Sequence, residues 1–183
     1  MRPTAGTNRD AMRPHNLGAI LRYVHRDGAL SRAALTSRMG LTRAAIGELL
    51  AELEALGVVT IVPGSGPRAK AGRPSPRVIP GTHQIQTLAA EIGADHIRTL
   101  AVGLGGRIVS RAARSTPRSH PPTAVADALV ELCESVTADV NDDVAVLGLG
   151  LGVAGVVALD GHIEMASSLG WVDLDFAELV QRR

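Results

Sequence analysis

Cysteine is almost absent from this sequence of 183 residues, which holds only Cys133. A single cysteine cannot form a disulfide within the chain, and it cannot build a cysteine-rich zinc site. On a helical pattern it is most simply a small buried hydrophobe. The cysteine content therefore excludes a disulfide-stabilised fold and gives no argument for an oxidising compartment.

Long apolar runs are also lacking. The one notable charge-free apolar stretch lies between Asp143 and Asp160 and has 16 residues, four of them glycine. A membrane helix needs about 20 apolar residues, and no apolar stretch follows the arginine-containing N-terminus, as it would in a signal peptide. We therefore expect a cytoplasmic protein without a membrane partner, in which this stretch forms two buried strands around a glycine turn.

Acidic residues are scarce in the first 80 residues and abundant afterwards. Residues 1–80 contain 12 Lys or Arg against 5 Asp or Glu, a net charge of +7, whereas residues 81–183 contain 7 against 13, a net charge of −6. This asymmetry predicts a polyanion-binding module at 1–80 and a domain with another task at 81–183.

Apolar residues at helical spacing predict three helices in the first half. The first helix is marked by a stripe of Leu17, Ile20, Leu21 and Val24. Ser31 is placed to cap the N-terminus of the second helix, which Gly40 closes, and Thr42 is placed to cap the third, which Gly57 ends. Three short helices with a four-residue turn between the last two outline a helix-turn-helix.

Two β-branched runs follow, at 58–62 and 77–79. The segment between them consists mostly of Pro, Gly, Ser, Ala and basic residues, contains no acid, and carries Arg68, Lys70 and Arg73. An interdomain linker would have the same composition. The position directly after the third helix favours a hairpin with a long basic tip, which is the wing of a winged helix-turn-helix.

The exposed side of the third helix predicts a DNA-reading surface, because its apolar stripe must face the core. The residues left for the major groove are Thr42, Arg43, Ala44, Gly47 and Glu48. Arg43 is the expected base reader, since a guanidinium can donate two hydrogen bonds to guanine O6 and N7. Ser31 and Arg32 are placed to touch phosphates. The alternative is that each of these residues is simply solvated.

The second half predicts α/β organisation. Strands are expected at 87–92, 97–104 and 107–112, followed by a helix capped by Thr123 and a buried central strand at 144–151. Gly150–Gly155 matches the dinucleotide-binding pattern GxGxxG, but a strand pattern follows where that site needs a helix. The histidines lack metal-ligand spacing. We therefore predict no catalytic, cofactor-binding or metal-binding residues.

Several segments resemble the ROK family of repressors and sugar kinases. The first half resembles the family's N-terminal module at residues 41–46, 52–53, 56–59 and 72–74. The second half resembles its ribonuclease-H-like, actin-like lobe at residues 88–93, 148–155, 169–171 and 173–174. In that family the Gly-Arg-Pro turn ends the wing, so the resemblance assigns Arg73 to a minor groove, where negative potential is concentrated. The helix-turn-helix alone would also fit MarR-like regulators.

The resemblance implies an α/β chain with a winged helix-turn-helix at 1–80 and an incomplete ribonuclease-H-like lobe at 81–183. The implied function is a non-enzymatic, sequence-specific repressor of sugar metabolism genes that binds double-stranded DNA. A sugar effector in a full-length form and a homo-oligomer are compatible with it. A pure interaction fragment without DNA binding is a third hypothesis.

An ATP-dependent sugar kinase is the main alternative. The family's kinases open with an Asp-x-Gly-Gly-Thr-Lys phosphate loop, whereas this chain has His96 in place of the lysine, and Asp95 would repel an anion. The family's sugar-site positions are Ala154, Gly155 and Ser168 here, so we expect no working sugar site. The kinases' catalytic aspartate and zinc site would lie beyond this sequence.

Overall fold

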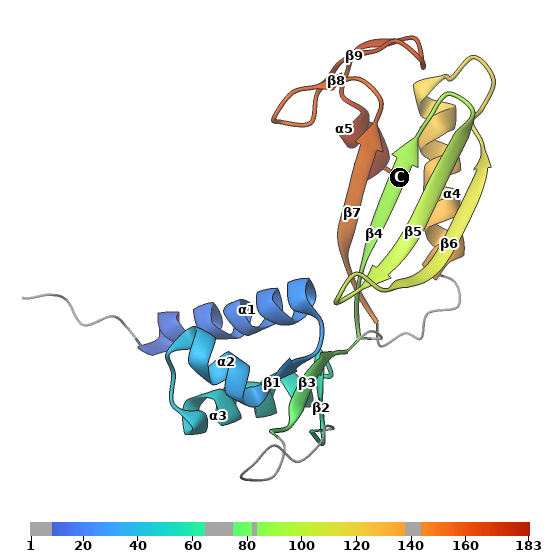
Figure 1. Cartoon of the computed structure of the whole chain (residues 1–183). Helices are drawn as coiled ribbons and strands as arrows, with labels where there is room; N and C mark the ends of the chain where they lie inside the picture. The colour runs from blue at the N-terminus through green and yellow to red at the C-terminus, as the bar shows by residue number, and fades with distance from the viewer. Residues whose placement is uncertain (1–8, 65–74, 82–83, 138–143) are drawn as a thin grey trace, which may run out of the picture. The chain divides into compact units, whose positions relative to one another are not determined.

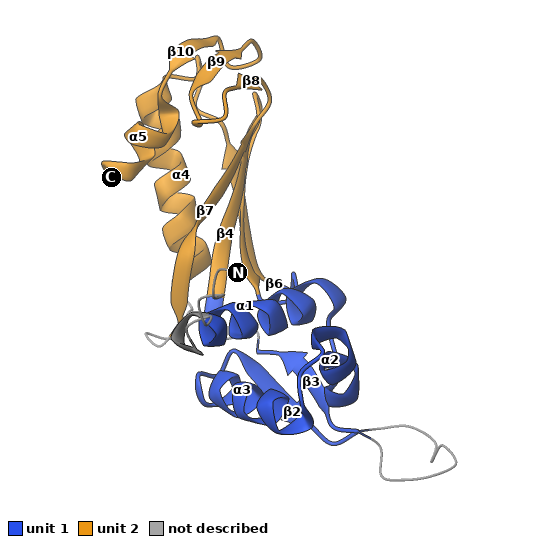
Figure 2. Cartoon of the chain, turned by 90° about the vertical axis from the view of Figure 1, so that its left-hand side faces the viewer, with its two compact units in different colours: residues 1–85, 104–107 blue, residues 86–103, 108–183 orange. Residues whose placement is uncertain are grey.

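The computed structural model describes residues 9–64, 75–81, 84–137 and 144–183, with side chains from residue 12 onward. The chain forms two compact units (Figure 2). The N-terminal unit comprises residues 1–85 and 104–107, and the C-terminal unit comprises residues 86–103 and 108–183.

The N-terminal unit contains three helices, α1 (Arg9–Asp27), α2 (Arg32–Met39) and α3 (Arg43–Ala55) (Figure 1). Gly28 and Gly57 follow the first and last of these helices in the left-handed region, with φ of 69° and 68°. That conformation suits glycine and ends a helix. The three predicted helices and the glycines that end them are confirmed.

Local capping fixes where α2 and α3 begin. The Ser31 hydroxyl accepts a hydrogen bond from the Ala34 N–H at 3.0 Å, and the Thr42 hydroxyl accepts one from the Ala45 N–H at 3.2 Å. Each cap satisfies a backbone donor that the helix leaves unpaired. Both predicted caps are therefore confirmed.

Three short strands complete the N-terminal unit: β1 (Leu30–Ser31), β2 (Val59–Val62) and β3 (Arg77–Pro80). They form an antiparallel sheet in the order β1-β3-β2, with Val78 opposite both Leu30 and Ile61. The sequence indicates β2 and β3 but not β1, because two residues are too few to show a strand period.

The core of this unit draws on every helix and on all three strands. Its buried apolar residues are Ile20, Val24, Leu30, Leu35, Ile46, Leu49, Leu50, Leu53, Val58, Val59 and Val78. Four of them come from one side of α3. That helix is thereby held on one side, and its opposite side is left toward solvent.

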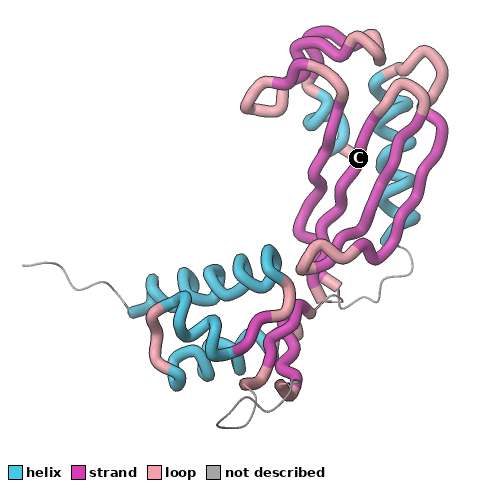
Figure 3. Tube along the Cα trace, viewed as in Figure 1, coloured by secondary structure: helices cyan, strands magenta, loops and turns pink. Residues whose placement is uncertain are grey.

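The C-terminal unit is built on a four-stranded sheet in the order β6-β5-β4-β7. Its strands are β4 (Ile85–Ile92), β5 (His96–Gly103), β6 (Ile108–Ser115) and β7 (Ala145–Val153). The first three form the predicted antiparallel meander. Strand β7 lies beside β4 (Figure 3) and runs in the same direction (Figure 1). Helix α4 (Pro122–Thr137) packs against β5 and β6.

Helix α4 begins one residue before the predicted cap. Thr123 is the second residue of the helix and not its cap, because Pro122 occupies the first helical position. A proline suits that position, since its φ is already helical and an N–H at that position would have no partner within the helix. The predicted apolar face is confirmed: Val125, Leu129, Leu132 and Val136 are all buried.

A second antiparallel sheet follows in the order β10-β9-β8, with strands β8 (Val156–Val157), β9 (Ile163–Ala166) and β10 (Trp171–Leu174). Helix α5 (Phe176–Gln181) comes last. Trp171 stacks on Phe176 with ring centroids 4.8 Å apart, and its indole N–H donates to the His120 carbonyl at 2.7 Å. These contacts hold β10 and α5 to the loop before α4.

The expectation of buried strands between Asp143 and Asp160 is wrong. Strands β7 and β8 form there, but every residue of β7 is exposed or half-buried, and Leu147 is 67% exposed. The reason is position, because β7 lies at an edge of its sheet and not at the centre. No described helix follows Gly155 directly, as the rejected dinucleotide site would require. Among the described helices, none has the length and apolar character needed to span a membrane.

Candidate nucleic-acid interface

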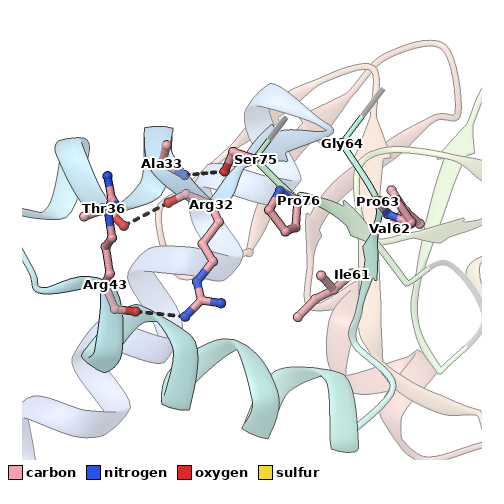
Figure 4. Close-up of a pocket in the computed structure, with 10 residues that line it drawn as sticks. All are labelled: Arg32, Ala33, Thr36, Arg43, Ile61, Val62, Pro63, Gly64, Ser75 and Pro76. Carbon is pink, nitrogen blue, oxygen red and sulfur yellow. Dashed lines mark hydrogen bonds between the residues drawn. The ribbon is translucent and has the colours of Figure 1, made fainter. Parts of the chain in front are cut away.

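A groove with a volume of about 750 Å³ lies where the first turns of α2 and α3 meet the ends of β2 and β3 (Figure 4). Two of the predicted DNA-contacting residues, Arg32 and Arg43, line it together. Ser75 and Pro76 border it from β3's side, and Ile61 borders it from β2. The fold therefore brings both arginines to one concave surface that the hairpin also reaches.

Arg32 is tied to its neighbours by backbone and side chain alike. Its guanidinium Nη2 donates to the Arg43 carbonyl at 2.9 Å, and its own N–H donates to the Pro76 carbonyl at the same distance. Its carbonyl accepts from the Thr36 hydroxyl at 2.9 Å. The side chain is half-buried, so Arg32 is an ordered residue at the junction of α2 and α3.

Arg43 has the opposite character. It is the first residue of α3 and is exposed. Within the described part of the chain, its guanidinium has no hydrogen bond or ion pair, and only its backbone carbonyl is engaged. A free guanidinium at the start of α3 can donate to an incoming ligand without first breaking an internal contact.

The other predicted residues of α3 fall into two groups. Thr42, Ala44 and Glu48 are exposed, as a groove-facing role requires, although Thr42 also caps the helix. Gly47 is only half-exposed, because the Arg32 guanidinium lies over it. Ser31 is half-buried at the start of α2, where its hydroxyl oxygen already accepts from the helix and its hydroxyl proton can still be donated.

The N-termini of α2 and α3 add positive electrostatic character to this surface. Neither helix has an acidic residue in its first turn. The aligned peptide dipoles give a helix N-terminus a partial positive charge that favours anions, although the first three N–H groups of α2 are already bonded to Pro76, Ser75 and Ser31. With two arginines beside two such termini, the surface is suited to a polyanion.

The basic residues predicted at the hairpin tip, Arg68, Lys70 and Arg73, lie outside the described residues. The described parts of the hairpin end at Gly64 and resume at Ser75. Ser75 is a residue that sequence reasoning missed: its hydroxyl accepts a hydrogen bond from the Ala33 N–H at 3.3 Å. A serine beside a proline shows no local signal for a contact made 42 positions away.

The segment compared above with the kinases' phosphate loop, residues 91–96, contains a tight turn between β4 and β5. The Gly93 N–H donates to the His96 carbonyl at 2.9 Å and closes the turn. Glu91 is exposed and lies 3.4 Å from Arg98 on the neighbouring strand.

Among the described residues, no group of three or more His, Cys, Asp or Glu could hold a metal ion. Cys133 is half-buried on α4, and burial raises the pKa of its thiol.

The antiparallel meander, helix α4 and the edge strand β7 form a mixed α/β arrangement whose fold is similar to that of a ROK family regulator of known structure. The ROK family profile matches residues 87–183, more than half of the sequence. The chain belongs to the ROK family, which confirms the resemblance stated above.

Two regulators match over almost the whole chain. The xylose repressor of Bacillus subtilis (strain 168) is 22% identical over 169 residues, which cover 92% of this chain and 43% of that protein. The crystal structure of a ROK family transcriptional regulator, a homologue of the E. coli MLC protein, has a TM-score of 0.62 at 16% identity and covers 93% of this chain and 43% of its own. The chain therefore spans less than half the length of these relatives.

A ROK family glucokinase from Streptomyces griseus is also similar, with a TM-score of 0.45 and 24% identity over 54% of this chain and 30% of that chain.

Proposed function

We propose that this chain is a sequence-specific DNA-binding transcriptional regulator of the repressor type, with residues 1–80 forming a winged helix-turn-helix and residues 81–183 part of a ROK-type lobe. The observation that carries the proposal is the convergence of Arg32 and Arg43 on one groove beside two helix N-termini. The repressor and regulator matches over more than 90% of the chain support it.

In this proposal α3 enters the major groove by its first turn. Arg43 reads a base edge there because its exposed guanidinium has the two donors that guanine O6 and N7 accept. The N-terminus of α2, with Ser31 and Arg32, lies toward the phosphates and fixes the register. Arg73 is proposed to enter a minor groove, and Arg68 and Lys70 are proposed to make further contacts with DNA.

The regulated genes are proposed to be those of sugar metabolism, since one relative is named a xylose repressor. A cytoplasmic, homo-oligomeric regulator whose longer form binds a sugar effector fits this assignment. We assign no sugar site to this chain, because Ala154 and Ser168 stand where the family's sugar-binding residues are expected.

Sugar phosphorylation is not part of the proposal. The turn after β4 is closed by its own backbone bond and carries Asp95 and His96, both exposed. A phosphate loop needs cationic and N–H groups directed at the phosphates. We expect no ATP-dependent phosphorylation of glucose or N-acetylglucosamine in a coupled ADP-release assay, and turnover above background would contradict the regulator-only assignment.

The test of DNA binding starts from a randomised duplex library selected on the full chain. The selected duplex, fluorescein-labelled, is then titrated in fluorescence anisotropy against a scrambled duplex of the same length. We expect preference for the selected duplex, and an affinity that falls with salt by roughly 0.9 log unit per log unit of salt for each phosphate neutralised. Failure to enrich any sequence, or a flat salt response, would overturn the proposal.

A further inference from the structure

Gly47 is a glycine inside a helix, in the fifth position of α3 (Arg43–Ala55). Glycine there is unfavourable relative to alanine, so a specific packing reason is expected. The structure supplies one. A Cβ built on Gly47 would lie 2.2 Å from Nη2 of Arg32 and 3.2 Å from its Cζ. Any side chain at position 47 would therefore occupy the space that the guanidinium fills.

The guanidinium uses this space to reach the Arg43 carbonyl, to which Nη2 donates at 2.9 Å (Figure 4). Helical pairing directs the N–H of Gly47 at the same carbonyl, which has two lone pairs. Arg32 thus bonds to the first turn of α3 directly over the glycine. The contact joins the residue that begins α2 to the residue that begins α3.

The backbone of the same α2 turn holds the base of the hairpin. The Arg32 N–H donates to the Pro76 carbonyl at 2.9 Å, and the Ala33 N–H donates to the Ser75 hydroxyl at 3.3 Å. Arg32 therefore connects α2 to α3 through one side-chain bond, and to the residue before β3 through one backbone bond. One of these elements, α3, carries the proposed base-reading residue Arg43.

We infer that Arg32 is a positioning residue for DNA specificity and that Gly47, because it has no side chain, leaves the space that the Arg32 guanidinium occupies. Together the two residues set where Arg43 lies relative to the base of the hairpin. The inference rests on the proposed DNA-binding function. Base readout depends on the placement of the reading side chain to within a fraction of an ångström, which its supporting contacts determine. Gly47 then acts through Arg32 and not by touching DNA itself.

The first variant is Gly47→Ala. The atom that the new methyl displaces is the far end of a flexible side chain, so the fold is retained, and alanine favours the helix. We expect a thermal midpoint equal to or above that of the parent chain. Binding to the selected duplex weakens by about tenfold, within the range of one base contact, while binding to the scrambled duplex changes by less than about twofold.

A matched control is Gly18→Ala in α1. A Cβ on Gly18 would meet only Arg22 Nη1 at 3.7 Å, an ordinary contact. The same change in another helix is expected to leave DNA binding unaltered. If Gly47→Ala binds the selected duplex as tightly as the parent chain does, the inference is overturned. If the parent chain itself shows no preference for the selected duplex, the proposed function is overturned instead.

The decisive comparison is Gly47→Ala in an Arg32→Ala background. If Gly47 acts by admitting Arg32, the glycine substitution should cost about tenfold in the parent but less than about twofold once Arg32 is gone. An equal loss in both backgrounds would show that Gly47 contacts DNA directly. Arg32→Lys separates charge from geometry: lysine keeps the charge but not the planar fork, and binding equal to the parent would show that Arg32 serves only as a cation.

Discussion

The two units of this chain differ in how they dispose of apolar side chains. In the described part of the N-terminal unit, Met12 and Leu56 are the exposed large hydrophobic residues. The C-terminal unit exposes many more: Ile108, Val109, Val146, Leu147, Val156, Val157, Leu159, Met165 and Val172. The first unit closes its core around three helices, whereas the second leaves apolar side chains exposed on both edge strands, β6 and β7, and on its small second sheet. Apolar content alone therefore does not show which part of a chain is self-contained.

The largest effect is expected from the N-terminal core. Leu50 on α3 is fully buried, so Leu50→Ala should destabilise that unit by about 2–5 kcal/mol and abolish DNA binding. Because the C-terminal unit has its own core, differential scanning calorimetry should show one transition lowered and another unchanged. Leu147→Ala is the control, since an exposed leucine should cost no more than about 0.5 kcal/mol. A single transition that moves as a whole would contradict this independence.

The uncovered apolar surface predicts self-association. Leu147 on β7 is 67% exposed, and Leu56 after α3 is 61% exposed. We expect concentration-dependent oligomers in sedimentation velocity, and Leu147→Glu should weaken them roughly tenfold or more, since burying one leucine contributes about 1.5–3 kcal/mol. Leu56→Glu should leave them unchanged. A parent chain that stays monodisperse would show that the exposed apolar residues of the C-terminal unit do not cause self-association.

Removing the proposed base reader, Arg43, tests whether DNA binding depends on the N-terminal unit and not on the C-terminal unit. Arg43→Ala should weaken binding to the selected duplex by about 1–3 kcal/mol and leave scrambled duplex nearly unaffected. Arg111→Ala removes the same charge from an exposed position on β6 of the C-terminal unit and should change neither. Equal losses on both duplexes would mean that Arg43 contacts only the backbone of DNA.

The smallest effect is a dependence of stability on pH. The carboxylate of Asp27 accepts hydrogen bonds from Arg26 and Arg38, which lower its pKa from 3.8 to about 2. A depressed pKa contributes stability above pH 3.8 that is lost as the pH falls toward 2, and exposed pairs of this kind are weak. Denaturant titrations of the parent and of Asp27→Asn should therefore converge across that window, and parallel curves would contradict the assignment.

Sequence reasoning succeeds where the determinants are local. Ser31, Thr42 and Gly40 act on the backbone within a few residues, so their helix boundaries can be read directly from the sequence. The exposure of β7 depends on its place at the sheet edge, which no local pattern encodes. The Arg32 contact with α3 is likewise tertiary, and the sequence indicates only that an arginine and a glycine are present. The start of α4 is an exception among the local signals, because Pro122 takes the first helical position and Thr123 lies inside the helix.

The stacking of Trp171 on Phe176 has a practical consequence for spectroscopy. The chain contains one tryptophan and one tyrosine, and they belong to different units, with Trp171 in the C-terminal unit and Tyr23 on α1 near Arg26 and Arg38. Intrinsic fluorescence from the indole thus reports on the C-terminal unit alone. The near-ultraviolet signal of the phenol reports on the N-terminal unit. Each half of the unlabelled chain therefore carries its own optical reporter of unfolding.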